Sequence, residues 1–300
     1  MKLFIFIFIL TIAPLGSYAQ NTVNQYDNNE ERHGVWRKHF DKTKELRYEG
    51  QFNHGKEIGL FKFYTLHKGE SVLSATKQFN ENDNKAVVKF LSSKGKIISE
   101  GQMNGKLYIG KWIYYHNKKD AIMTIEYYNN GQLEGEKLVF YPDGNTAEKA
   151  NYANDKLEGK STWYSENGKV LKEFLYKNGE FHGISTYYDA SGNIQAEGLY
   201  KNGLKEGVWT YYEGKRLSKK LNYKNGKLQG KVTWYSKKGK LFKDLQYERG
   251  LLHGKCRYFD SLGNIESKGI YIKGIKDGDW SYYKNGKLLK TENHTKPKKQ

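Results

Sequence analysis

Histidine is the first residue type in this 300-residue sequence that could do chemistry. His33, His182 and His253 each stand directly before a glycine, and imidazole nitrogen is a common zinc ligand. Gly183 and Gly254 are separated by about six predicted strands, which is roughly 29 Å, whereas a zinc ligand lies about 2 Å from its metal. The sequence therefore predicts that these histidines share no metal site and act as turn residues.

Cys256 is the only cysteine, so no intramolecular disulfide can form. It stands two residues after a glycine, where equivalent segments hold Trp112, Trp209, Val232 and Trp280. We therefore expect a packing position rather than a nucleophile, because the neighbouring sequence offers no base. The glycines are not followed by helices, which a phosphate-binding loop requires. We predict no catalytic residue, metal site or cofactor, and no enzyme.

The elements that position these residues belong to an internal repeat. "YKNGEFHGISTYYDASGN" from Tyr176, "YKNGLKEGVWTYYEGK" from Tyr200 and "YKNGKLQGKVTWYSKKGK" from Tyr223 share the formula Tyr-x-x-Gly-x-x-x-Gly, an aromatic pair and a further glycine turn. Successive units follow at spacings of 23 to 27 residues. The second glycine of each unit, here called the repeat glycine, is Gly34, Gly59, Gly110, Gly135, Gly159, Gly183, Gly207, Gly230, Gly254 or Gly278, and Ala86 stands in its place in one unit. About ten and a half units fill residues 33–290.

Each unit divides into two segments of strand length. Runs such as "KVTWYS" alternate and are rich in aromatic and β-branched residues, whereas recurrent glycines disfavour a helix. Asn-Gly and Lys-Gly steps supply the positive φ angles of hairpin turns. The predicted fold is all-β: an elongated, twisted antiparallel sheet of tandem hairpins with about 22 strands.

The second segment of each unit carries an apolar residue six positions before its terminal aromatic, such as Val170 before Tyr176. An even spacing predicts that both lie on the same face. The equivalent apolar positions are Leu46, Leu73, Ile97, Ile122, Thr146, Val170, Ile194, Leu217, Leu241 and Ile265.

Two rows of aromatic residues follow the repeat glycines. The row four residues after the glycine is expected to be core: Tyr114, Trp163, Tyr187, Tyr211, Trp234, Tyr258 and Tyr282. The row five residues after it points to the opposite face and is either structural or a binding surface: Tyr115, Tyr164, Tyr188, Tyr212, Tyr235, Phe259 and Tyr283.

The two ends of the chain differ from the repeats. "MKLFIFIFILTIAPLGSYAQ" combines a basic start, an apolar run and a small-residue cleavage site, which is typical of a signal peptide over residues 1–19. Residues 20–32 are interpreted as a linker and residues 291–300 as a basic tail. The protein is therefore expected to be exported, to the periplasm or the exterior. An excess of 51 Lys and Arg over 33 Asp and Glu would attract anionic surfaces, although most lysines lie at turns, where solvated charge discourages aggregation.

The repeat resembles the MORN repeat, in particular the bacterial variant with the cadence "YxNGxxxGxWxxYxxxGK" seen from Tyr200 to Lys215. The resemblance covers about 85% of the chain. It implies a hairpin array that acts as a scaffold or binding surface, and many proteins of the variant type carry a YwqK-like antitoxin label.

Together these features favour an exported, non-enzymatic scaffold. The expected partner is a protein, with the cell envelope or another anionic surface as the alternative, rather than nucleic acid or a small-molecule substrate. An antitoxin-like or immunity protein is the second hypothesis, although a signal peptide would remove it from the cytoplasm. A hydrolase whose residues converge only in three dimensions is the third.

Overall fold

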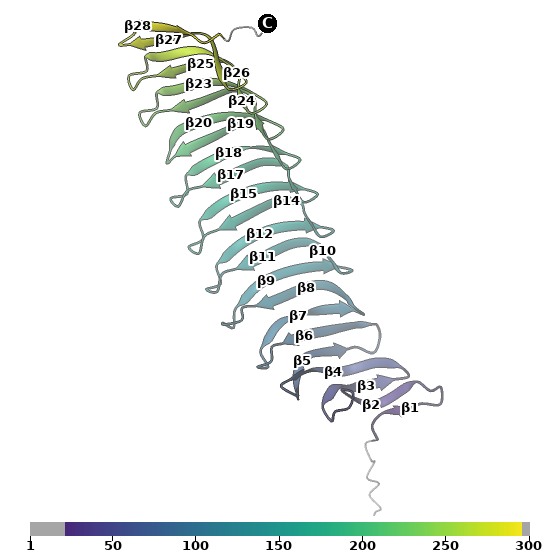
Figure 1. The fold of residues 1–300 in the computed structure, drawn as a ribbon. Helices are drawn as coiled ribbons and strands as arrows, with labels where there is room; N and C mark the ends of the chain where they lie inside the picture. The colour runs from purple at the N-terminus through teal and green to yellow at the C-terminus, as the bar shows by residue number, and fades with distance from the viewer. Residues whose placement is uncertain (1–21, 296–300) are drawn as a thin grey trace, which may run out of the picture. The chain divides into compact units, whose positions relative to one another are not determined.

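The computed structural model describes residues 22–295, which form 28 β-strands and no helix (Figure 1). Twenty-two strands span six residues or more, and the other six span two residues. The predicted all-β array of antiparallel hairpins is confirmed, and the predicted count of about 22 matches the longer strands. None of residues 22–295 lies in a helix long and apolar enough to cross a membrane. The predicted signal peptide lies outside the described residues.

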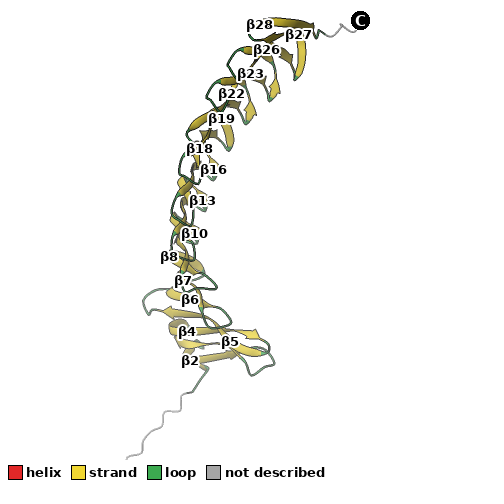
Figure 2. Cartoon of the chain, turned by 90° about the vertical axis from the view of Figure 1, so that its left-hand side faces the viewer, coloured by secondary structure: helices red, strands yellow, loops and turns green. Residues whose placement is uncertain are grey.

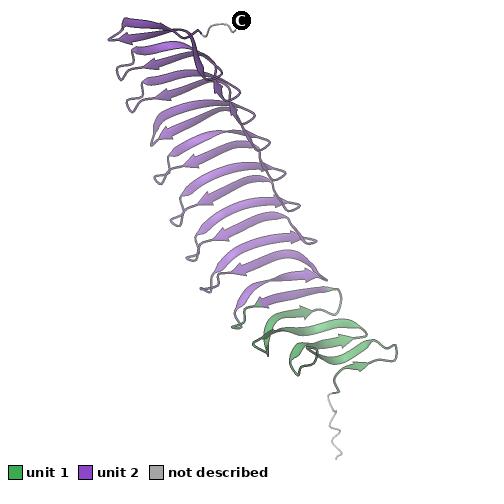
Figure 3. Ribbon diagram, in the orientation of Figure 1, with its two compact units in different colours: residues 1–84, 91–95 green, residues 85–90, 96–300 purple. Residues whose placement is uncertain are grey.

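The chain divides into two compact units, residues 1–84 with 91–95 and residues 85–90 with 96–300 (Figure 3). In the first unit each strand pairs with the next one in the chain. Its strands are β1 (Gln25–Tyr26), β2 (Arg32–His39), β3 (Leu46–Asn53), β4 (Lys56–His67) and β5 (Glu70–Phe79). Within the segment interpreted as a linker, β1 therefore joins the sheet by pairing with β2.

In the second unit the longer strands again follow chain order, joined by turns and by two-residue strands (Figure 2). They are β6 (Lys85–Leu91), β7 (Ile97–Asn104), β8 (Leu107–Tyr115), β9 (Ile122–Asn129), β11 (Gly135–Phe140), β12 (Thr146–Ala153), β14 (Gly159–Tyr164), β15 (Val170–Lys177), β17 (Gly183–Tyr188), β18 (Ile194–Lys201), β19 (Leu204–Glu213), β20 (Arg216–Lys224), β22 (Gly230–Tyr235), β23 (Leu241–Glu248), β25 (Gly254–Phe259), β26 (Ile265–Ile272), β27 (Ile275–Lys284) and β28 (Lys287–Asn293). The two-residue strands are β10 (Gln132–Leu133), β13 (Lys156–Leu157), β16 (Glu180–Phe181), β21 (Lys227–Leu228) and β24 (Leu251–Leu252).

Left-handed backbone recurs at two places in each regular unit. The Asn202-Gly203 turn has φ angles of 50° and 74°, as a type I′ hairpin turn requires, which confirms the turn prediction. The second place with left-handed backbone is the repeat glycine itself, and Gly207 has a φ angle of 66°. A side chain is disfavoured there by backbone strain alone, because a Cβ atom at Gly207 would meet nothing within 4 Å.

The Gly207→Ala variant should therefore lose about 1 to 2 kcal/mol of unfolding free energy, the cost of placing a Cβ atom in left-handed backbone. Urea unfolding followed by circular dichroism measures the loss. Gly207→Asn is the matched control and should lose less, because asparagine tolerates this conformation better. Equal stability of wild type and Gly207→Ala would contradict the strain argument.

The core lies along one face of the strands, here called the first face, which carries the residue two positions after the repeat glycine. In the second unit this residue is almost completely buried from β6 onward, with β11 as the exception, where it is Lys137. The buried residues of this row are Val88, Trp112, Ser161, Ser185, Trp209, Val232, Cys256 and Trp280, and Phe61 is the equivalent in the first unit. The packing role predicted for Cys256 is therefore confirmed.

Residue size alternates along this row in a complementary way. Where the row holds a large ring, the residue eleven positions earlier is glycine, and the ring lies on its backbone: a Cβ atom at Gly198 would lie 2.3 Å from the Trp209 ring. Where the row holds a small residue, the earlier position is filled instead: Phe174 stands eleven positions before Ser185 and pairs with Ser161. This exchange of volume keeps the packing dense in a single sheet.

One prediction about the faces is wrong. Trp163 pairs with Lys172, but Tyr164 pairs with Val170, so Leu171 is an extra residue in the returning strand. Such a β-bulge changes the alternation of side chains. Val170 therefore shares a face with Tyr164 and not with Tyr176, and the same shift recurs in the other hairpins.

Candidate functional site

The face opposite the core, here called the second face, carries the seven candidate binding aromatics. Six of them are half-buried, and Phe259 is 9% exposed. Each of the seven aromatics pairs with an apolar residue of the returning strand, at the position next to the β-bulge. Each of these hairpins therefore contributes one aromatic–aliphatic pair to the second face. The pairs are Tyr115 with Ile122, Tyr164 with Val170, Tyr188 with Ile194, Tyr212 with Leu217, Tyr235 with Leu241, Phe259 with Ile265 and Tyr283 with Leu288.

Carboxylates hold several of these tyrosines in place. Tyr115 donates a hydrogen bond to Glu100 over 2.5 Å, and the Glu100 carboxylate together with burial raises the pKa of Tyr115 to about 12. Tyr212 donates to Glu197 over 3.2 Å, and burial together with this carboxylate raises the tyrosine's pKa. Tyr188 makes the same contact with Glu173 over 3.2 Å. These hydroxyl groups are neutral and oriented, and the rings are fixed.

The charge beside the aromatic row differs in sign from hairpin to hairpin. The residue fifteen positions before Tyr283 is Lys268, whose ammonium group lies 5.4 Å from the centre of the tyrosine ring. The Lys268 hydrogen bond lowers the pKa of Tyr283. The aromatic row is therefore bordered by anions near Tyr115 and Tyr188 and by a cation near Tyr283.

Exposed aliphatic side chains complete the second face around β17, β18 and β19. Ile184 is 63% exposed, pairs with Leu199, which is 41% exposed, and lies on the same face as Val208, which is 55% exposed. Sequence reasoning missed these residues. The signal was available, because Ile184 and Val208 both stand directly after a repeat glycine and therefore face away from the buried row.

The aromatic row expected as core packs beside the buried row on the first face. Tyr211 is half-buried, with its ring centre 6.3 Å from that of Trp209. The Lys205 ammonium group lies 4.0 Å from the centre of the Trp209 ring and donates to the Tyr211 hydroxyl over 2.9 Å. Lysine stems thus cover the outer side of the core.

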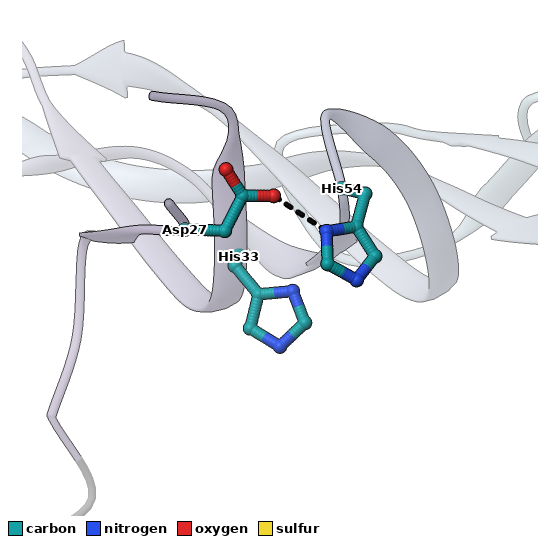
Figure 4. Close-up of side chains that lie close together, drawn as sticks. All are labelled: Asp27, His33 and His54. Carbon is teal, nitrogen blue, oxygen red and sulfur yellow. Dashed lines mark hydrogen bonds and ion pairs between the residues drawn. The ribbon is translucent and has the colours of Figure 1, made fainter. Parts of the chain in front are cut away.

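The three histidines singled out in the sequence have different neighbours in the structure. His253 contacts Glu248 at 3.4 Å, and the backbone amide of His182 donates to the Leu175 carbonyl, as expected for turn residues. His33 instead lies beside Asp27 and His54, with the three ligand atoms within 4.8 Å of one another (Figure 4). Cys256 is buried, and burial raises the pKa of its thiol.

Comparison with known families identifies part of the repeat array. Residues 133–154, 157–178 and 181–202 match the MORN repeat variant. These MORN-variant segments contain the longer strands from β11 to β18. The register of the repeat glycine continues beyond them, since Gly207, Gly230, Gly254 and Gly278 all have positive φ.

Other comparisons are more distant. No curated protein matches the sequence at a significant level. The Tc holotoxin pore of Photorhabdus luminescens is similar at 12% identity over 87% of this chain and 14% of that chain, with a TM-score of 0.19. A porin-like protein from Bacteroides uniformis is similar at 9% identity over 72% of this chain and 93% of that chain, with a TM-score of 0.17. The chain thus spans about one seventh of the toxin chain.

Proposed function

We propose that this chain is a non-catalytic binding protein that holds a protein partner on the second face of its second unit. The observation that carries the proposal is the exposed aliphatic cluster of Ile184, Leu199 and Val208. Contiguous exposed apolar side chains of this kind typically mark interaction surfaces. The match to the MORN repeat variant supports a binding role over catalysis.

The neighbouring tyrosines suit the same role. Tyr188 and Tyr212 lie on the same face, four residues further along the strands of Ile184 and Val208, and hydrogen bonds to Glu173 and Glu197 already orient them. An ordered aromatic side chain loses little entropy when a partner covers it. The signal-peptide pattern of residues 1–19 supports a partner outside the cytoplasm.

Substitution of the cluster should abolish capture of the partner. Ile184→Asp should reduce crosslinking in native cell envelopes about tenfold or more, because it places a charge at the centre of an apolar contact. Wild type and the Ile184→Asp variant are each crosslinked in the cell envelope. The captured species are then identified and quantified by mass spectrometry. Leu262→Asp is the matched control, since it adds the same charge at an exposed turn residue and should capture as wild type does.

Three outcomes would contradict the proposal, in its binding face, its partner or its role. Equal capture by wild type and Ile184→Asp would remove the second face from consideration. Binding to anionic vesicles at low salt, without a captured protein, would favour the cell envelope as partner. Capture of a toxin, with protection of cells by co-expression, would favour the antitoxin-like hypothesis.

A further inference from the structure

Three side chains of metal-binding type meet in the first unit, which does not contain the proposed binding face. Asp27 lies in the turn between β1 and β2, His33 lies in β2, and His54 lies in the turn between β3 and β4. Figure 4 shows the carboxylate and both imidazole rings gathered in one place. One ligand atom from each lies within 4.8 Å of the other two.

Backbone contacts fix the direction of the Asp27 carboxylate. Its Oδ1 atom accepts hydrogen bonds from the amides of Asn29 over 2.8 Å and Glu31 over 3.0 Å. Its Oδ2 atom points to His54 Nδ1 at 2.5 Å. Only 10% of the Asp27 side chain is exposed. The carboxylate is therefore oriented towards the imidazoles before any ligand binds.

The His54 turn is tied to the strand that carries His33. His54 and Gly55 have φ angles of 45° and 77°, and the Gly55 amide donates to the Arg32 carbonyl over 2.9 Å. The two imidazole ring centres lie 4.8 Å apart. Both histidines are thus held by backbone structure, although their rings are largely exposed.

Lysine and arginine side chains next to the cluster are engaged elsewhere. The Arg32 guanidinium lies 4.8 Å from the centre of the Phe52 ring. The Lys56 ammonium group donates to the Glu81 carbonyl over 2.7 Å. These two cations, one residue from His33 and two residues from His54 in the sequence, therefore have contacts other than the Asp27 carboxylate.

The positions of His33 and His54 in the repeat hold other residues in many later hairpins. There the residue before the repeat glycine accepts a hydrogen bond from the backbone of the next turn: Asn178 donates to Glu158 over 2.7 Å, and Asn225 donates to Glu206 over 2.8 Å. His33 and His54 occupy the corresponding positions, and the β1–β2 turn adds Asp27. At this place two imidazoles and a carboxylate therefore stand where these later hairpins have a glutamate and an asparagine turn.

We propose that Asp27, His33 and His54 bind a divalent transition-metal ion, with zinc as the reference ion. Two imidazole nitrogens and one carboxylate oxygen form an established zinc ligand set. Ligand atoms about 2.0 to 2.2 Å from a tetrahedral ion lie roughly 3.3 to 3.6 Å apart, so small side-chain movements suffice. Three protein ligands leave a fourth coordination position for water or for a donor atom of a partner.

Titration of the chelator-treated full-length chain with zinc chloride tests the site. Calorimetry should show one high-affinity equivalent, and cobalt chloride should give the visible absorption of a tetrahedral ion. Asp27→Asn, His33→Ala and His54→Ala should each weaken zinc binding at least about tenfold, as loss of a ligand requires. His182→Ala is the matched control, because this histidine also precedes a repeat glycine, and its zinc affinity should equal that of wild type.

Circular dichroism establishes that each variant is folded, and Asp27→Asn preserves the shape of the side chain. Two results would overturn the site. One is no saturable zinc binding to wild type, which would leave Asp27 and His54 as an ion pair only. The other is an affinity within about threefold of wild type in all three ligand variants, which would place the bound zinc elsewhere.

Discussion

Replacement of Trp209 by alanine is expected to lower the free energy of unfolding by about 3 to 5 kcal/mol. The Trp209 ring is 0% exposed and lies on the backbone of Gly198. The Tyr200 ring packs against it in an edge-to-face arrangement, with the two ring centres 4.9 Å apart. Its indole nitrogen donates to the Leu199 carbonyl over 3.0 Å, and the Lys205 ammonium group lies over the ring. Alanine would leave a cavity that glycine at position 198 cannot fill.

Denaturant unfolding followed by circular dichroism measures the loss of unfolding free energy. Native-state hydrogen exchange shows which strands are destabilised. In a repeat array each unit contacts mainly its neighbours, so protection should fall first in β18, β19 and β20. Trp234→Ala is the matched control, because Trp234 is only half-buried and should lose less. Equal losses for the two variants would show that burial on the first face does not set stability.

The hairpin array was predictable because its signals are local. Glycine and asparagine at the turns reflect backbone φ, and aromatic pairs between turns reflect a pleated strand, so neither signal needs knowledge of distant contacts. Asn202-Gly203 and Gly207 show this, since their positive φ angles follow from residue type and spacing. The two-residue strands such as β16 were not predicted, because they depend on pairing and leave no pattern of their own.

The assignment of faces was harder because it depends on register. A single extra residue, Leu171 in one hairpin, moves Val170 to the opposite face, and strand periodicity does not reveal a bulge. The buried row was also hidden by its composition. Ser185 and Trp209 occupy equivalent positions, and their common burial becomes clear only beside Phe174 and Gly198.

The histidine cluster could be predicted only in part. In the repeat, the residue before one repeat glycine lies beside the turn of the next hairpin. His33 and His54 occupy these two positions, so the spacing of the sequence contained a signal for their contact. Asp27 lies before the first unit, where that register does not apply. Its position follows from the pairing of β1 with β2, which the interpretation of residues 20–32 as a linker did not anticipate.

The alternation of residue size on the first face leads to the second prediction with a large effect on stability. Two substitutions that are each destabilising should partly compensate when they are combined. Gly198→Phe alone should cost about 3 kcal/mol, because its Cβ atom would lie 2.3 Å from the Trp209 ring. Trp209→Ser alone should cost about 3 to 5 kcal/mol by leaving a cavity. The double variant places phenylalanine between two serines, as Phe174 lies between Ser161 and Ser185 in the native row.

The double variant should therefore recover about 2 kcal/mol or more relative to the sum of the single losses, measured as a double-mutant cycle in urea. Gly198 has no left-handed φ angle, so the clash is the only obstacle to phenylalanine there. Gly269→Phe with Trp209→Ser is the control cycle and should be additive, because Gly269 faces Trp280. Equal coupling in the two cycles would mean that the first face tolerates volume anywhere, and the pairing of rings with glycines would then have no structural role.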